Sequence, residues 1–297
     1  MPKDCPIKVN AKAGTCIIDQ KQLPAIGFGT YPLTGKICED SVSKAIHTGY
    51  RIIDTATYYK NFTAIAQSLK DQNRSDFYLV SKVWHDRQYP KALESDLNHT
   101  LEKLETDYLD AYHLHWPNSE IPIDRTLATM ERLRQERKIR HLGLSNVTTN
   151  HLKKALKYHI PISWVQVEMH PHFSDFKLLK FCHEHSIALQ AWRPLNKGRI
   201  FEDTLLIELG KKYHKTAGQV ALRWILQHKV IALPGSKTKS HIEENMNIFD
   251  FSLSEEEMLQ IDKKAKTGNR VRVTEDRGMG FTDEFDFLYE ECWPTAE

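Results

Sequence analysis

Long apolar runs are missing from this sequence. No stretch of about 18 consecutive apolar residues occurs, which excludes a membrane-spanning helix. The first residues lead into no apolar segment, so we expect no secretory signal. A charge excess is missing too, because 41 Lys and Arg against 39 Asp and Glu leave a net charge of +2. This balance argues against nucleic-acid binding and against attachment to an anionic membrane.

Cysteine is scarce and scattered along the chain. Five cysteines are present without any C-x-x-C spacing, and they are Cys5, Cys16, Cys38, Cys182 and Cys292. An odd number of scattered cysteines is typical of reduced thiols in a cytosol. We therefore expect a cytoplasmic protein.

Short β-rich apolar runs alternate with amphipathic segments along the chain. In residues 90–105, for example, Pro90 suits a first helical turn and leucines repeat along one face. Eight strands are expected, over residues 25–29, 50–55, 77–84, 108–116, 139–146, 164–170, 187–193 and 230–233. Strands alternating with helices indicate parallel βαβ units, and eight units in roughly 250 residues predict an α/β protein, a (β/α)8 TIM barrel.

Short additions flank the predicted barrel. Residues 8–19 predict an N-terminal β-hairpin that turns at Ala13 and Gly14. After the eighth strand, extra C-terminal helices are expected from about Lys239 and over residues 254–266, followed by an acidic, aromatic tail at 275–297. No linker or repeat divides the sequence, which predicts one domain over residues 1–297.

Two nucleotide-binding arrangements fit the sequence poorly. An open doubly wound sheet needs a third glycine on its first βα turn, where Pro32 stands in the segment Gly27-Phe28-Gly29-Thr30-Tyr31-Pro32. A phosphate-binding loop at residues 235–238 would need an earlier glycine, and Val230 stands there. The barrel is therefore preferred to both.

Polar residues stand where the predicted strands end. Asp54, Lys82 and His115 end three consecutive strands, so parallel pairing places them within ~10 Å of one another. Two tyrosines, Tyr58 and Tyr59, follow directly after the first of these ends. A lysine held charged by an aspartate lowers the pKa of a nearby phenol, which then donates its proton readily to a carbonyl oxygen. The group predicts proton-transfer chemistry.

A set of motifs resembles the aldo-keto reductases, and in particular the bacterial branch of diketogluconate and methylglyoxal reductases. The motifs include L-P-A-I-G-F-G-T, G-Y-R-I-I-D-T-A-x-x-Y-x-N, S-K-V-W, G-L-S-N, V-Q-V-E-M-H-P and A-W-R-P-L. The resemblance implies a barrel that binds a nicotinamide cofactor without a glycine fingerprint and reduces aldehydes or ketones. By position, the implied catalytic residues are Asp54, Tyr59, Lys82 and His115.

The resemblance also implies binding residues for cofactor and substrate. Cofactor contacts are expected from Gly29, Thr30, Asp54, Ser145, Asn146, Gln166, Trp192, Arg193, Leu195, Ser236, Lys237, Thr238, His241, Glu244 and Asn245. The substrate pocket is expected to be walled by Tyr31, Trp84, His115 and Trp116. Arg193 replaces a smaller residue, and it either reaches the pyrophosphate or is an exposed charge at a strand end.

The implied phosphate loop departs from the usual pattern. The family's lysine and arginine are replaced by Gly235 and His241, while Lys237 and Lys239 supply charge from neighbouring positions. We therefore expect NADPH to be preferred to NADH by a smaller margin than usual, with NADH as a weaker cofactor.

Two other functions are compatible with a barrel. A metal-dependent hydrolase is suggested by the pairs His113/His115, His170/His172 and His183/His185, although the eighth strand lacks the carboxylate that such a site needs. The second function is that of a non-catalytic barrel that binds the cofactor as a sensor or accessory subunit. The expected protein is a monomer without metal that acts on a small carbonyl compound. The short connection at residues 118–124 points to small or varied substrates without naming one.

Overall fold

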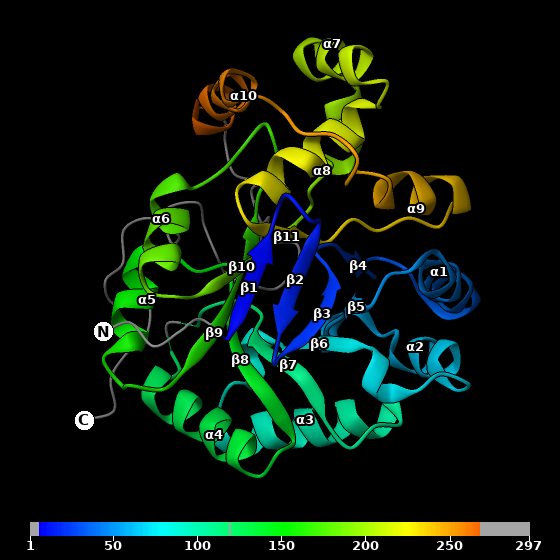
Figure 1. Cartoon of the computed structure of the whole chain (residues 1–297). Helices are drawn as coiled ribbons and strands as arrows, with labels where there is room; N and C mark the ends of the chain where they lie inside the picture. Colours follow the sequence, from blue (N-terminus) through cyan, green and yellow to red (C-terminus); the bar gives the residue numbers. More distant parts are fainter. Residues whose placement is uncertain (1–5, 119, 268–297) are drawn as a thin grey trace.

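The computed structural model describes residues 6–118 and 120–267 (Figure 1). Its main sheet has eight parallel strands in the order β11-β10-β9-β8-β7-β6-β5-β4. The strands are β4 (Gly27–Gly29), β5 (Ile52–Asp54), β6 (Tyr78–Val83), β7 (Leu109–Leu114), β8 (Ile139–Ser145), β9 (Ile162–Glu168), β10 (Ala188–Trp192) and β11 (Val230–Ala232). Each of the eight overlaps a run that the sequence predicts, with bounds that differ by a few residues, so the predicted (β/α)8 barrel is confirmed.

The sheet curls until its first and last strands meet. Ile26 forms a parallel bridge with Ala232, and the Gly29 amide donates to the carbonyl oxygen of Pro234 at 3.0 Å. A Cβ at Gly29 would lie 2.7 Å from the carbonyl oxygen of Leu233. A side chain at position 29 would therefore push the two strands apart, so this glycine is needed where the barrel closes.

Helices surround the sheet (Figure 1). They are α1 (Gly35–Thr48), α2 (Phe62–Leu69), α3 (Pro90–Leu104), α4 (Ile123–Gln135), α5 (Thr149–Leu156), α6 (Phe176–Glu184), α7 (Thr204–Tyr213), α8 (Ala217–Gln227), α9 (Lys239–Met246) and α10 (Glu255–Thr267). Helix α3 starts at Pro90, as predicted, and buries Leu93, Leu97 and Leu101. Among the described residues, no helix has the length and apolar character needed to cross a bilayer.

A small antiparallel sheet lies over one end of the barrel (Figure 1). It contains the predicted hairpin, β1 (Ile7–Asn10) and β2 (Thr15–Ile18), and a third strand that was not predicted, β3 (Lys21–Pro24). Asp19 and Gln20 join β2 to β3 with φ angles of 49° and 68°. These left-handed angles are usually adopted by pairs such as Asn-Gly or Asp-Gly. The pair Asp19-Gln20 lacks the glycine, so the sequence did not indicate a turn here.

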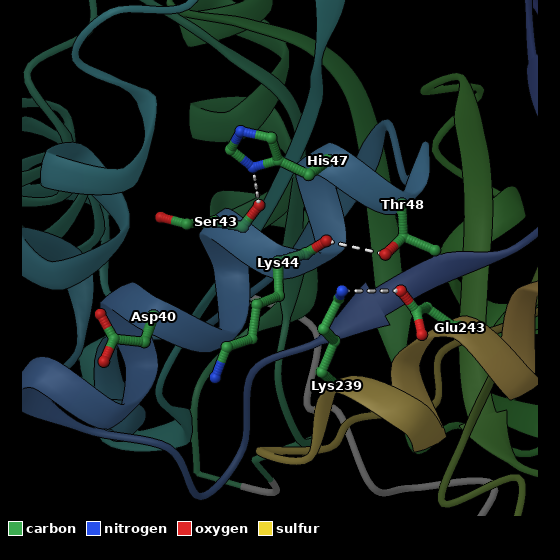
Figure 2. A pocket seen from close by; sticks show the side chains of 7 residues that line it. All are labelled: Asp40, Ser43, Lys44, His47, Thr48, Lys239 and Glu243. Carbon is green, nitrogen blue, oxygen red and sulfur yellow. Dashed lines mark hydrogen bonds and ion pairs between the residues drawn. The ribbon is translucent and has the colours of Figure 1, made fainter.

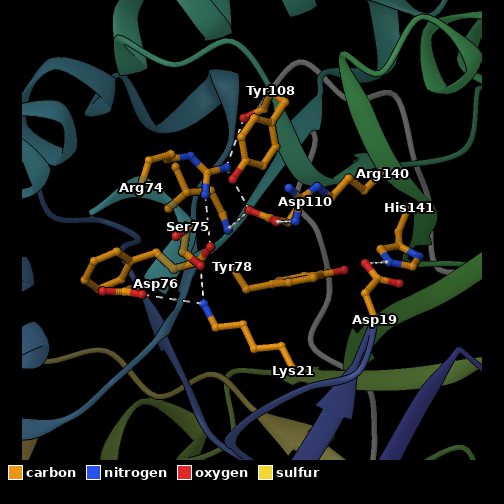
Figure 3. A network of polar contacts seen from close by, with 12 residues as sticks. Asp19, Lys21, Arg74, Ser75, Asp76, Tyr78, Tyr108, Asp110, Arg140 and His141 are labelled. Atoms are coloured by element: carbon orange, nitrogen blue, oxygen red, sulfur yellow. Dashed lines mark hydrogen bonds and ion pairs between the residues drawn. The ribbon is translucent and has the colours of Figure 1, made fainter. Parts of the chain in front are cut away.

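Polar contacts tie this small sheet to the N-terminal ends of the barrel strands (Figure 3). Asp19 accepts a hydrogen bond from His141 of β8 over 2.8 Å. Nearby, the buried Asp110 carboxylate pairs with Arg74 at 2.7 Å and Arg140 at 3.2 Å. This end is therefore closed by protein, which leaves the opposite end, where the strands terminate, for chemistry. The predicted tail at 275–297, with Cys292, lies outside the described residues, as does Cys5.

Candidate active site

The predicted catalytic residues lie together at the C-terminal ends of the strands. Asp54 ends β5, Lys82 lies in β6 and His115 follows β7, while Tyr59 lies in a short 3-10 turn, η1 (Thr57–Tyr59). Lys82 Nζ donates to both carboxylate oxygens of Asp54, at 2.8 and 2.7 Å. The same nitrogen lies 3.5 Å from Tyr59 Oη. The lysine therefore bridges the carboxylate and the phenol, as expected for a proton-transfer group.

The pKa values of this group follow from burial and from the ion pair. Burial lowers the pKa of Lys82, whose side chain is 0 % exposed, and the Asp54 carboxylate opposes that shift. Burial also raises the pKa of Tyr59 well above its ordinary value, with Asp54 adding to the effect. The expected lowering of the Tyr59 pKa is therefore wrong for this structure, because the cost of burying a phenolate, with the negative charge of Asp54 added to it, outweighs the effect of the nearby ammonium.

His115 is a neutral imidazole beside the tyrosine. Burial, with the charge of Lys82, holds its pKa well below the ordinary value. Its ring lies 5.6 Å from that of Tyr59 and 5.0 Å from that of Trp84, edge-on in both cases. Its Nδ1 has no hydrogen-bond partner within residues 6–118 and 120–267. A neutral histidine carries one N–H, which it can offer to a substrate oxygen.

Two residues that were not predicted, Asn61 and Asp96, help to hold the turn that carries Tyr59. Asn61, which is buried, accepts from the Thr55 hydroxyl at 2.6 Å and donates to the Leu33 carbonyl at 3.0 Å. The Thr57 hydroxyl lies 2.8 Å from Asp96 Oδ1 on α3 and 3.1 Å from the Lys82 carbonyl. Asn61 is part of the Y-x-N motif and was recognisable from the sequence. Asp96 lies in a helix distant in sequence, where nothing marks it.

Hydroxyl and amide groups gather next to this proton-transfer group. Gln166 Nε2 donates to Asp54 Oδ1 and to Gln190 Oε1, both at 2.8 Å, which leaves its own oxygen as an acceptor. Asn146 Nδ2 donates to the His115 carbonyl at 2.9 Å, and its second N–H stays available among the described residues. Ser145 is the register neighbour of Gln166. The cluster can therefore both donate to and accept from a carboxamide, as the nicotinamide ring requires.

The aromatic residue expected to stack on the nicotinamide is fixed by the same cluster. Trp192 ends β10, and its indole Nε1 donates to Asn146 Oδ1 at 2.8 Å. Asn146 adopts a φ of 58°, a left-handed conformation that asparagine tolerates better than most residues. The ring and the amide are therefore held as one unit.

Several residues expected to contact the cofactor are engaged within the protein. The Thr30 hydroxyl donates to the Asp54 carbonyl at 2.9 Å. Arg193 lies 3.8 Å from Glu168 and its side chain is only 15 % exposed, so the alternative of an exposed charge at a strand end is wrong. Leu195 packs against the core. Gly29 lies at the barrel closure described above.

Helix α9, which follows the loop after β11, contacts a different helix on each side. Lys239 pairs with Glu243 at 3.4 Å, and both line a depression of 560 Å³ between α1 and α9 (Figure 2). On the α8 side, Glu244 accepts from the Thr216 hydroxyl at 2.6 Å. The remaining expected contacts differ in exposure: Lys237, Thr238 and His241 are exposed, Ser236 is half-buried and Asn245 is buried. Within the described chain, Lys237 forms no ion pair, which leaves its ammonium available for a phosphate.

The aromatic residues expected to line the substrate pocket differ in exposure. Tyr31 is 43 % exposed and lies 5.0 Å from the Tyr59 ring. Trp84 stacks on Tyr58 at 4.1 Å. Trp116 is 7 % exposed, so most of its ring is covered by protein.

The histidines of the suggested metal site have other partners. His170 contacts Glu168 at 3.0 Å, and His172 contacts Asp203 at 2.6 Å. Among the described residues, no three His, Cys, Asp or Glu side chains are arranged to hold a metal ion.

Comparison with known proteins gives one consistent result. A profile described as the aldo/keto reductase family matches residues 25–266. Glyoxal reductase of Bacillus subtilis (strain 168) is 38 % identical over 245 residues, covering 81 % of this chain and 88 % of the relative. A methylglyoxal reductase of Yersinia pestis is 34 % identical over 258 residues, covering 83 % and 91 %. The aldose reductase structure from Schistosoma japonicum has a TM-score of 0.84 at 28 % identity, covering 96 % of this chain and 99 % of that one.

Proposed function

The chain belongs to the aldo/keto reductase family, and on that premise we propose that it is an NADPH-dependent reductase of small aldehydes and ketones, with Tyr59 as proton donor. Family membership makes it an oxidoreductase that reduces carbonyl compounds. The observation that supports the specific proposal is the contact of one buried ammonium, Lys82 Nζ, with both the Asp54 carboxylate and the Tyr59 hydroxyl. The donors and acceptors of Ser145, Asn146 and Gln166 fit a carboxamide, which supports the proposal that the chain binds a nicotinamide cofactor.

Each residue has a distinct role in this proposal. Tyr59 is protonated at neutral pH, as any tyrosine with an ordinary or raised pKa is, so it can give its proton to the carbonyl oxygen. Lys82 then stabilises the resulting phenolate, since a positive charge favours the ionised form. Asp54 keeps the lysine charged despite burial. When bound, the reduced nicotinamide supplies the hydride that reaches the carbonyl carbon.

We predict that His115→Gln lowers kcat/KM for aldehydes by about 10- to 100-fold, because glutamine keeps an N–H but displaces it from the carbonyl oxygen. Because burial and the charge of Lys82 hold the His115 pKa well below its ordinary value, the imidazole is neutral at neutral pH. The wild-type pH profile should therefore lack an acidic limb near pH ~6.5, the ordinary histidine pKa. His99→Gln, at an exposed position on α3, is the matched control. If His115→Gln kept the wild-type kcat/KM for aldehydes, His115 would not be the donor to the carbonyl oxygen.

We predict that Lys237→Ala raises KM for NADPH by about 10-fold or more, the effect of losing one charged hydrogen bond, and leaves KM for NADH unchanged. Lys239→Ala is the comparison variant, because that lysine, which the sequence also predicted to supply charge, pairs with Glu243 on the α1 side of α9. Its KM for NADPH should rise less than that of Lys237→Ala. Equal KM values for the two cofactors in the wild type, or no rise in Lys237→Ala, would show that this loop does not recognise the 2′-phosphate.

The whole proposal is tested by following NADPH oxidation with a panel of carbonyl compounds. Glyoxal and methylglyoxal belong in the panel because the relatives carry those names, and larger aldehydes and ketones complete it. Turnover of at least one compound is expected. Tight NADPH binding without turnover of any compound would instead favour the non-catalytic barrel.

A further inference from the structure

A second histidine lies inside the barrel next to the proton-transfer group. His113 of β7 is the register neighbour of Lys82 on one side and of Gly143 on the other. Register neighbours project to the same face of a sheet, so His113 shares the interior with Lys82. A Cβ at position 143 would lie 2.1 Å from the His113 ring. The glycine therefore provides the space that the imidazole fills.

The contacts of His113 are few and specific. Its Nδ1 lies 3.3 Å from the hydroxyl oxygen of Ser145, at the end of β8. Its Nε2 is buried and has no hydrogen-bond partner among the described residues. Burial, together with the charge of Lys82, holds the pKa of His113 well below its ordinary value. The ring is therefore neutral and carries a single N–H.

The position of that proton follows from the contacts. A proton on Nε2 would leave a buried N–H group without an acceptor, and orphaned N–H groups are rarer in proteins than orphaned acceptors. A proton on Nδ1 is instead donated to Ser145 Oγ. The serine then acts as acceptor toward His113, so its own O–H points elsewhere as a donor.

We propose that His113 is a positioning residue that fixes the Ser145 hydroxyl as a hydrogen-bond donor to the carboxamide oxygen of the nicotinamide. This inference rests on the proposed function, which places the carboxamide at Ser145, Asn146 and Gln166. Without the imidazole, the hydroxyl would rotate between donor and acceptor orientations. His113 thus improves binding of the nicotinamide half of the cofactor by preorganising one donor.

The test compares His113→Leu, His113→Asn and His113→Gln, with NADPH affinity measured by quenching of tryptophan fluorescence. Asparagine places an amide near the Nδ1 position, whereas glutamine places it near Nε2. His113→Leu and His113→Gln are expected to raise Kd about 10-fold, the effect of about one hydrogen bond. His113→Asn should stay within about 3-fold of wild type. Affinity for adenosine 2′,5′-bisphosphate, which lacks the nicotinamide, should be unchanged in all three variants.

A double-mutant cycle with Ser145→Ala separates this inference from the proposed function. His113→Leu should weaken NADPH binding no further once Ser145 is alanine. Additive losses, equal Kd values in the leucine and asparagine variants, or weakened binding of the bisphosphate would overturn the role of His113 alone. An unchanged Kd in Ser145→Ala by itself would instead overturn the placement of the carboxamide, and with it this inference.

Discussion

Replacement of Tyr59 by phenylalanine is expected to lower kcat by ~10²–10⁴, the usual contribution of a general acid, while NADPH still binds. The hydroxyl that is lost is the one in contact with Lys82 Nζ. The ring itself contacts Tyr31 and His115, and phenylalanine keeps those contacts. The expected loss is therefore one of proton transfer rather than of folding. The measurement is single-turnover NADPH oxidation beside the fluorescence-derived cofactor Kd.

Tyr58→Phe is the matched control, one residue away on the same turn. Tyr58 is 37 % exposed and stacks on Trp84, and phenylalanine preserves the stack. Its kcat should change by no more than about 3-fold, since substitutions at exposed positions usually have small effects. Comparable losses in the two variants would show that the turn, rather than the Tyr59 hydroxyl, is what the substitutions disturb.

The barrel could be predicted because its signal is local and repeated. Each strand is a short apolar run, and each polar residue at a strand end follows such a run directly, as Asp54 follows Ile52 and Ile53. Parallel pairing then brings the strand ends to one face without further information. The proximity of Asp54 and Lys82 followed from this alone.

The remaining features depend on contacts between distant segments. Asp96 reaches Thr57 across 39 residues and Gln166 reaches Asp54 across 112, and neither pairing is marked in the sequence. The sequence predicted a lowered pKa for Tyr59, and this prediction was wrong for a related reason. The sequence indicates that a lysine lies nearby, whereas the sign depends on how fully the phenol is buried and on which group takes the lysine's charge.

Replacement of Lys82 by methionine should lower both activity and stability, for two different reasons. Activity should fall by ~10²–10³ or more, because the phenolate of Tyr59 then forms without a neighbouring positive charge. The variant should also be destabilised by about 3–5 kcal/mol, since it leaves the buried Asp54 carboxylate without its cation. Both effects arise from one pair whose side chains are 0 % and 6 % exposed.

The double variant Asp54→Asn/Lys82→Met distinguishes the two effects. Removing the carboxylate's charge along with the lysine leaves no uncompensated ion, and replacing both members of a buried pair is often close to neutral for stability. Asparagine also keeps an oxygen that can accept from Gln166 Nε2, as Asp54 Oδ1 does at 2.8 Å. Urea unfolding should therefore show stability largely regained, while kcat stays as low as in Lys82→Met. If kcat returned together with stability, the ion pair would serve folding alone and Tyr59 would not need the lysine's charge.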